Sequence, residues 1–279
     1  MNGYQPELST MLPVPLYELK PFSKSRKLVI DVVKLGRSKH HVPILFEVDV
    51  TEVREGFRRY REKTGTPVSF TGWAVKCIAQ AVSEYKQMHG LRLGRRNLIL
   101  FQEIDVLVTV QKSVEEEFIP LPVVVRNANG KSILQINEEI QAAKHELASN
   151  STMMLGSNPW YASLYQHIPG AIRSLIGRAM LRKPFAIKRT TGTVGVSSIG
   201  MVGNFAGWAI PVGPLPIQFA LGGISKKPAL VNAKLENRDI LCVCFVFDHD
   251  VVDGAPVAAF TSRLAELMQS AHGMSELDR

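Results

Sequence analysis

The sequence has no long apolar run. Its longest unbroken apolar stretch, Ile240 to Phe247, has eight residues, whereas a membrane-spanning helix needs about 20. The N-terminal residues MNGYQPELST lack the apolar core of a secretory signal. Because apolar residues make up 46% of the chain and charged residues 21%, as in average folded domains, the composition excludes a disordered, collagenous or coiled-coil protein. We therefore expect a soluble, cytoplasmic protein.

Cysteine is also scarce, with three residues among 279. Cys242 and Cys244 lie two apart in an apolar run, which places them on one face of a strand. This spacing matches neither a CxxC pair nor a zinc site. We predict that these two residues and Cys77 are buried, reduced thiols. Apart from His249, the histidines show no metal-ligand spacing either, so no metal site is expected.

Acidic residues are missing from a long internal stretch, although the net charge of the whole chain is only +8. Between Leu147 and Leu235 there is no Asp or Glu, while the same stretch holds nine Lys or Arg residues. The other 24 basic residues nearly balance the 25 acids. Such a zone favours a polyanion: nucleic acid, an anionic membrane surface or a phosphorylated cofactor. Nucleic acid is disfavoured, because the stretch has no recognisable nucleic-acid-binding motif and its basic residues are not interleaved with aromatic residues.

Hydrophobic periodicity predicts a mixed α/β domain. It indicates strands over residues 41–53, 98–110 and 119–125 and helices over residues 54–63, 69–85 and 132–147. The chain has no internal repeat, low-complexity tract or Ser/Gly linker, so we expect one domain spanning residues 1–279.

Residues 160–190 predict a basic amphipathic helix. Ile172, Leu175, Ile176, Ala179 and Met180 form a stripe at helical spacing, with arginines on the other faces. Such a helix lies on an anionic membrane, docks on a partner or packs on its own domain. Because packed amphipathic helices are commonplace, we expect the stripe to face the core and the arginines to be solvated. Peripheral membrane contact through residues 160–190 is the less favoured alternative.

The strongest local pattern is a buried strand, a turn and a helix between residues 240 and 268. The apolar run ILCVCFVF is followed by DHDVVDG and then by helical spacing at Val257, Phe260 and Leu264. The turn places His249 at the end of a rigid strand, where an imidazole can be held in one orientation for general base catalysis. Taken alone, HxxxDG is a weak motif, and its spacing favours a surface histidine with Asp253 as a helix cap over catalysis.

Several segments together resemble a known family, the acyltransferase core of 2-oxo acid dehydrogenase complexes, and its relative chloramphenicol acetyltransferase. HxxxDG resembles the family signature DHRxxDG. Residues 191–200, TGTVGVSSIG, resemble its GTFTISNLG strand, and LGGI at 221–224 is similar to ILGVG. Residues 42–110 follow the opening order of the family, and residues 25–27 resemble its SxxRKxIA segment. The resemblance covers about four-fifths of the chain and implies the mixed-sheet α/β sandwich of these coenzyme A-dependent acyltransferases.

The resemblance also implies the chemistry. In such enzymes a histidine removes a proton from a thiol, the thiolate attacks an acyl thioester, and a hydroxyl stabilises the tetrahedral oxyanion. Here the base would be His249 and the hydroxyl Ser197, with its neighbour Ser198 as the alternative. Asp253 and Gly254 would hold the loop, Asp253 through Arg26.

The family further implies a homotrimer with active sites between subunits, so that Ser197 and His249 come from different chains. Coenzyme A or its acyl thioester would be the substrate, entering one end of a channel, and a separate lipoyl or other carrier protein the other end. The acid-free stretch contains Ser197 and is expected to meet the phosphates of coenzyme A.

The sequence departs from the family pattern in four features, which limit how much of the family's function can be assigned to this chain. No lipoyl or partner-binding domain fits, so we expect no covalent lipoyl group on this chain. Asp250 replaces the signature arginine and would favour a protonated imidazole unless it points away. Residues 151–189 form an atypical basic insertion, and the polar residues 270–279 predict an isolated trimer rather than a cage. These departures leave a catalytically silent trimeric scaffold or regulatory protein of the same fold as the alternative to a stand-alone acyltransferase.

Overall fold

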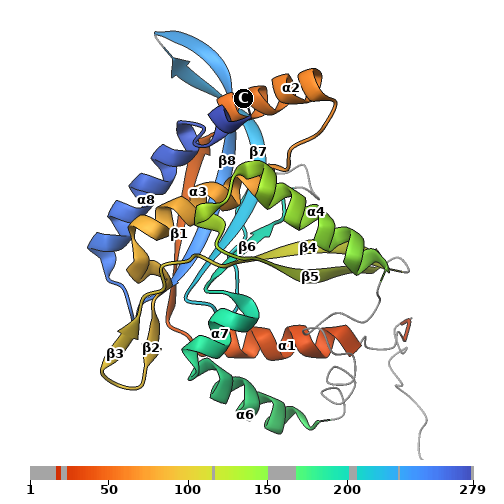
Figure 1. Ribbon diagram of the computed structural model, residues 1–279, viewed down its shortest axis with the longest axis vertical. Coiled ribbons are helices and arrows are strands. Elements are labelled where there is room, and N and C mark those ends of the chain that lie inside the picture. Colours follow the sequence, from red (N-terminus) through yellow and green to blue (C-terminus); the bar gives the residue numbers. More distant parts are fainter. Residues whose placement is uncertain are drawn as a thin grey trace, which may run out of the picture.

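The computed structural model describes residues 17–19, 24–114, 117–149, 168–200, 206–231 and 233–277. Its centre is one mixed sheet of six strands in the order β1-β8-β7-β6-β4-β5 (Figure 1). The strands are β1 (His41–Asp49), β4 (Val106–Val114), β5 (Glu117–Val125), β6 (Val194–Ser198), β7 (Ile217–Val231) and β8 (Lys234–Asp248). Strand β6 runs parallel to both β4 and β7, and the other pairs are antiparallel. The mixed α/β prediction is therefore confirmed.

The helices gather in two places (Figure 1). Helices α3 (Phe70–Glu84), α4 (Ile133–Ser149) and α8 (Gly254–Gln269) supply buried residues to the main core on one face of the sheet. Helix α1 (Lys24–Gly36) lies beside α6 (Gly170–Leu181) and α7 (Pro184–Thr191) near one end of the molecule. The remaining elements are α2 (Thr51–Thr64), the hairpin of β2 (Leu91–Leu93) and β3 (Asn97–Ile99), and the short 3-10 helices η1 (Lys86–His89), η2 (Ala128–Gly130) and η3 (Met274–Glu276).

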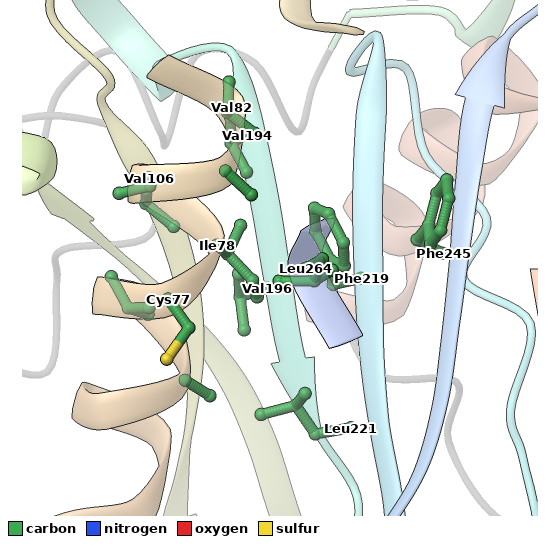
Figure 2. Close-up of a cluster of buried hydrophobic side chains, with 14 of the residues drawn as sticks. Cys77, Ile78, Val82, Val106, Val194, Val196, Phe219, Leu221, Phe245 and Leu264 are labelled. Carbon is green, nitrogen blue, oxygen red and sulfur yellow. The ribbon is translucent and has the colours of Figure 1, made fainter. Parts of the chain in front are cut away.

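The main core forms where α3 crosses the sheet. Its side chains at Cys77, Ile78 and Val82 lie against Val194 and Val196 of β6 (Figure 2). Nearly every residue of α3 is buried, which explains why its sequence is apolar on most sides. Ser69 caps this helix by accepting a hydrogen bond from the Gly72 N–H. The helix predicted at residues 69–85 is confirmed.

Strands β7 and β8 each have two different halves. The half of β8 from Leu241 to Asp248 is buried, whereas the residues nearer its start are exposed or half-buried. The partner strand β7 shows the matching change from buried to exposed along its length. The buried halves of β7 and β8 therefore lie in the centre of the sheet, and their exposed halves form a two-stranded ribbon. Leu230 and Leu235 are paired and exposed near the tip of this ribbon.

Two predicted strand boundaries are wrong. The strand expected over residues 41–53 ends at Asp49, because Thr51 already begins helix α2 and donates its N–H to the Asp49 carboxylate. The strand expected over 98–110 is two strands, β3 and β4, which belong to different sheets.

The expectation for the amphipathic stripe is also wrong. The segment forms two helices, α6 and α7, and no residue of α6 is buried. The apolar residues Ile172, Leu175, Ile176 and Met180 are exposed. Residues 150–167, the first part of the expected insertion, lie outside the described residues.

The three cysteines are free and buried, as predicted. Cys242 and Cys244 lie on the face of β8 opposite Val243 and Phe245, which belong to the main core. Within the described ranges, no helix is long and apolar enough to cross a membrane, and no group of three or more His, Cys, Asp or Glu side chains is arranged to hold a metal ion.

Candidate active site

The turn that carries His249 is fixed by backbone hydrogen bonds on both sides. Strand β8 ends at Asp248, whose carbonyl accepts the N–H groups of Val251 at 3.0 Å and Val252 at 3.3 Å. The N–H of His249 donates to the carbonyl of His40 at 3.0 Å, which ties the turn to the residue before β1. These bonds hold the histidine backbone at the end of a rigid strand.

A buried ion pair supports the same turn. The Asp248 side chain is 3% exposed, and one of its carboxylate oxygens accepts a hydrogen bond from Lys39 Nζ at 2.8 Å. The other oxygen accepts the N–H of Asp250 at 3.3 Å. A buried carboxylate needs both a counter-charge and hydrogen-bond donors, and Asp248 has them.

Asp250, which replaces the arginine of the family signature, is engaged on the far side of the turn. Its carboxylate accepts a hydrogen bond from His40 Nδ1 at 2.8 Å and lies 3.7 Å from Arg92 Nη1. The hydrogen bond from His40 lowers the pKa of Asp250. Among the described residues no ion pair joins Asp250 to His249. The extra carboxylate thus points away from the imidazole, the condition under which it does not oppose a neutral base.

The imidazole of His249 is 45% exposed and packs beside Phe247, with 5.5 Å between the ring centroids. Its Nδ1 lies 3.8 Å from Asp253 Oδ1, which is too far for a hydrogen bond. Asp253 occupies the N-cap position of α8, yet its side chain makes no capping bond and is 91% exposed. Gly254 is the first residue of α8, and a Cβ there would meet nothing within 4 Å.

Arg26 does not reach Asp253 within this chain. It lies in the first turns of α1, its side chain is exposed, and no ion pair between the two appears in the described ranges. The roles assigned to Arg26 and Asp253 by resemblance stay predictions.

Ser197 and Ser198 end strand β6, and both are half-buried. Side chains alternate along a strand, so Ser198 shares the face of Val194 and Val196, which is covered by α3 (Figure 2). Ser197 is on the opposite face, beside Thr109 of β4 and Ala220 of β7. The two candidate hydroxyl groups therefore belong to different sides of the sheet.

The register separates Ser197 from His249 along the strand direction of the sheet. Ser197 pairs with Ala220, which pairs with Cys244. His249 lies five residues beyond Cys244, so at about 3.3 Å per residue the two side chains are separated by roughly 15 Å or more. A base and an oxyanion donor must both reach one reacting group about 3 Å away. Within one chain these two residues cannot form one site.

Sequence reasoning missed the side chains that hold the two candidate residues in place. Lys39, His40 and Arg92 are distant from His249 in the sequence and give no spacing signal. His41 begins strand β1, whereas His40 binds Asp250. Thr109, beside Ser197, carries no motif either.

A comparison with protein-family models matches residues 15–154 and 164–275 to the 2-oxoacid dehydrogenases acyltransferase catalytic domain. The lipoamide acyltransferase component of the branched-chain alpha-keto acid dehydrogenase complex of Bacillus subtilis is 25% identical over 259 residues, covering 90% of this chain and 52% of that protein. The mitochondrial dihydrolipoyllysine-residue succinyltransferase component of the 2-oxoglutarate dehydrogenase complex of Saccharomyces cerevisiae is 24% identical, covering 82% and 42%. The chain thus spans about half the length of the curated relatives it matches.

Among solved structures, dihydrolipoamide acetyltransferase of Azotobacter vinelandii matches with a TM-score of 0.66 and 20% identity, covering 98% of this chain and 99% of that one. That structure comes from a study of a serine, a histidine and an asparagine in catalysis. A probable dihydrolipoamide acetyltransferase of Listeria monocytogenes matches with a TM-score of 0.64 and 18% identity, covering 91% and 95%. These two likenesses confirm the predicted acyltransferase fold.

Proposed function

The chain belongs to the family of 2-oxoacid dehydrogenase acyltransferase catalytic domains, and on that premise we propose that it transfers an acyl group between coenzyme A and a thiol of the dihydrolipoyl type. The observation that carries the proposal is the turn at His249. A half-exposed imidazole stands at the end of a rigid strand, and the one atypical acid beside it, Asp250, is bound to His40 and Arg92 instead. The imidazole is therefore available as a base.

The proposed reaction has two steps. His249 removes the proton of the acceptor thiol, and the thiolate forms a bond to the carbonyl carbon of the acyl thioester. The resulting oxyanion accepts a hydrogen bond from the Ser197 hydroxyl. The intermediate then breaks its bond to the original sulfur, and that thiolate takes the proton back from the imidazolium. A positioned base contributes about 10²–10⁴-fold and an oxyanion donor about 10²–10³-fold.

The spacing of the residues supports these roles. In the Azotobacter vinelandii enzyme the investigated serine precedes the histidine by 52 residues, and the asparagine follows it by four. Ser197 precedes His249 by the same 52 residues, and Asp253 follows by the same four. This agreement favours Ser197 over Ser198. It also pairs Asp253 with a position that holds an uncharged amide in that enzyme.

We further propose that the site forms between subunits of a homotrimer. The wide separation of Ser197 and His249 in one chain requires a second copy to complete the site, and a closed ring of copies repeats the same contact at each interface. The half-exposed imidazole and the exposed Asp253 carboxylate leave room for a neighbouring chain.

The basic stretch around Ser197 supports coenzyme A binding only in part. Three of its nine bases are paired with acids from elsewhere: Arg173 with Asp31, Lys188 with Asp105, and Lys227 with Glu47. Lys226 is exposed on β7, six residues beyond the partner of Ser197. We infer that Lys226, which is exposed and forms no ion pair within the described ranges, is a candidate for a contact with a phosphate of coenzyme A.

The test is turnover of acetyl-coenzyme A with free dihydrolipoamide by the full chain, with His249→Ala beside it. We expect turnover by the wild type and a loss of about 10²–10⁴-fold in the variant, because the base is removed. His145→Ala is the control histidine variant, because His145 is an exposed residue of α4 and is not part of the turn that carries His249.

The alternative is a silent scaffold of the same fold, and binding measurements separate it from a wrong acceptor. An inert wild type that still binds coenzyme A in a calorimeter would retain the site but refute the dihydrolipoyl acceptor. A protein that neither binds coenzyme A nor turns over acetyl-coenzyme A would refute the enzyme and favour the scaffold.

A further inference from the structure

Helix α6 presents its apolar side to solvent. Four of its side chains, Ile172, Leu175, Ile176 and Met180, follow helical spacing and are exposed, Leu175 to 68%. We call these four residues the outer face of α6. In a water-soluble domain such a stripe normally faces the core, so its exposure needs a separate explanation.

The opposite side of α6 is the one that docks on the domain. Arg173 Nε donates to the Asp31 carboxylate of α1 at 2.7 Å, and both side chains are largely buried. Gly177 lies so close to α1 that a Cβ there would be 2.7 Å from Leu35 Cδ1. One ion pair and one close contact thus fix which way the helix faces. The outer face therefore points away from α1, and helix α6 itself lies at the edge of the molecule (Figure 1).

Positively charged side chains lie near the outer face in the sequence. Arg178, Arg182 and Lys183 are exposed, and none of them forms an ion pair within the described ranges. The surrounding sequence offers no neutralising acid, because Asp and Glu are absent between Leu147 and Leu235. By contrast, Arg173 on the docking side is neutralised by Asp31. The uncompensated cations on α6 and directly after its end are therefore exposed to solvent.

This combination selects among the possible occupants. A second copy that placed the same face against this one would bring the unpaired Arg178 and Arg182 of both copies together, and like charges repel. An anionic lipid surface offers phosphates for the arginines and an apolar layer for the stripe in the same plane. Because α6 has 12 residues, it is about 18 Å long and suits binding in the plane of the interface rather than across it.

We propose that the outer face of α6 binds anionic membrane surfaces. The stripe inserts at the boundary between headgroups and acyl chains, and Arg178, Arg182 and Lys183 contact lipid phosphates. Since α6 is separate from the turn that carries His249, this inference is independent of the proposed acyl transfer.

The experiment is co-sedimentation of the full chain with vesicles of phosphatidylcholine containing increasing fractions of phosphatidylglycerol. We expect binding that rises with the anionic fraction and falls with added salt. Leu175→Asp should lower the apparent affinity at least about tenfold, because the leucine that inserts into the lipid is replaced by a charge that anionic lipid repels.

A matched pair of variants controls for general effects of a new surface charge. Ile176 of α6 and Leu98 of the β2–β3 hairpin are both 41% exposed. Ile176→Asp should weaken vesicle binding, whereas Leu98→Asp should leave it at the wild-type level. Circular dichroism and melting temperatures of both variants show that the fold is kept.

Three results would overturn the proposal. One is the absence of sedimentation at every phosphatidylglycerol content in low salt. Another is equal binding by wild type, Leu175→Asp and Ile176→Asp, which would assign lipid contact to a different surface. The last is a combination of two observations: the wild type does not bind vesicles, and light scattering shows that the two α6 variants change their oligomeric mass. That combination would assign the outer face to a second copy.

Discussion

Two regions of the central sheet carry the candidate catalytic residues and are held in different ways. They are the turn after β8, here called the His249 end, and the end of β6, here called the Ser197 end. At the His249 end, charged side chains fix the turn through the pairs Lys39–Asp248 and His40–Asp250. At the Ser197 end, the backbones themselves come close. The N–H of Ile199 donates to the Leu221 carbonyl at 3.0 Å, and a Cβ on Gly200 would clash with the carbonyl oxygen of Gly222.

This difference predicts how each end responds to substitutions. The His249 end depends on electrostatic partners, so removal of one partner leaves a buried charge behind. The Ser197 end depends on close packing at glycines, so it tolerates no added side chain there but does not depend on a counter-charge. The two ends are the halves of one proposed site, and variants at each end test them separately.

After the loss of the base in His249→Ala, the largest effect on turnover is expected at the serine end. Ser197→Ala should lower turnover of acetyl-coenzyme A by about 10²–10³-fold, because the oxyanion loses its donor. Ser198→Ala is the matched control, since it removes the same hydroxyl from the next residue but on the helix-covered face of β6. We expect it to keep turnover within about tenfold of wild type. Loss in Ser198→Ala with little change in Ser197→Ala would reverse the assignment.

The second prediction concerns the pH dependence of stability, through a histidine next to the start of β6. His89 is fully buried and joined by a hydrogen bond to Thr193, the residue before β6. Burial, helped by the charge of Lys188, lowers the pKa of His89 to about 4. The folded protein therefore keeps this imidazole neutral where the unfolded chain, with an ordinary pKa near 6.5, binds a proton.

The sign of the pH dependence follows. The contribution of His89 to stability is fully present above about pH 6.5, falls as the pH drops toward about 4, and is level below that, for a total of roughly 3 kcal/mol. Urea unfolding at several pH values measures it. His89→Gln should flatten the slope between these pH values, and an unchanged slope in that variant would refute the assignment.

The third prediction concerns the stability of the His249 end, which depends on the ion pair between Lys39 and Asp248. Lys39→Met leaves the buried Asp248 carboxylate without its counter-charge and should cost roughly 1–3 kcal/mol of unfolding free energy. Lys34→Met is the control, because Lys34 is exposed on α1 and forms no ion pair within the described part of the chain. Both unfolding free energies come from urea titrations.

A double variant checks the cause. Lys39→Met with Asp248→Asn should recover part of the lost stability, since no charge then remains buried. If the double variant is less stable than Lys39→Met alone, the loss comes from packing and not from the unpaired carboxylate.

Much of the fold was predictable because periodicity and burial coincide. Helix α3 is apolar on most sides and is largely buried, and the run 241–247 of β8 is apolar and buried. The orientation of α6 was not predictable. The stripe alone indicates packing inward, whereas the observed direction depends on Arg173 meeting Asp31, which is 142 residues away in the sequence.

The candidate site was predictable as residue types but not as geometry. The motif around His249 and the serine strand identified both residues by resemblance. Their separation along the sheet follows from the register of β6, β7 and β8, which no local pattern specifies. The partners of Asp250 were likewise hidden, because His40 lies 210 residues earlier.

The central claim is that Ser197 of one chain and His249 of another form one acyl-transfer site, and subunit mixing tests it most directly. His249→Ala and Ser197→Ala are purified separately, mixed in equal amounts, dissociated, reassembled and assayed with acetyl-coenzyme A and dihydrolipoamide. If the sites lie between subunits, about a quarter of the interfaces carry both wild-type residues, so about a quarter of wild-type turnover should return. If turnover stays at the level of the separate variants while mixed trimers are present, the two residues do not share a site across the interface.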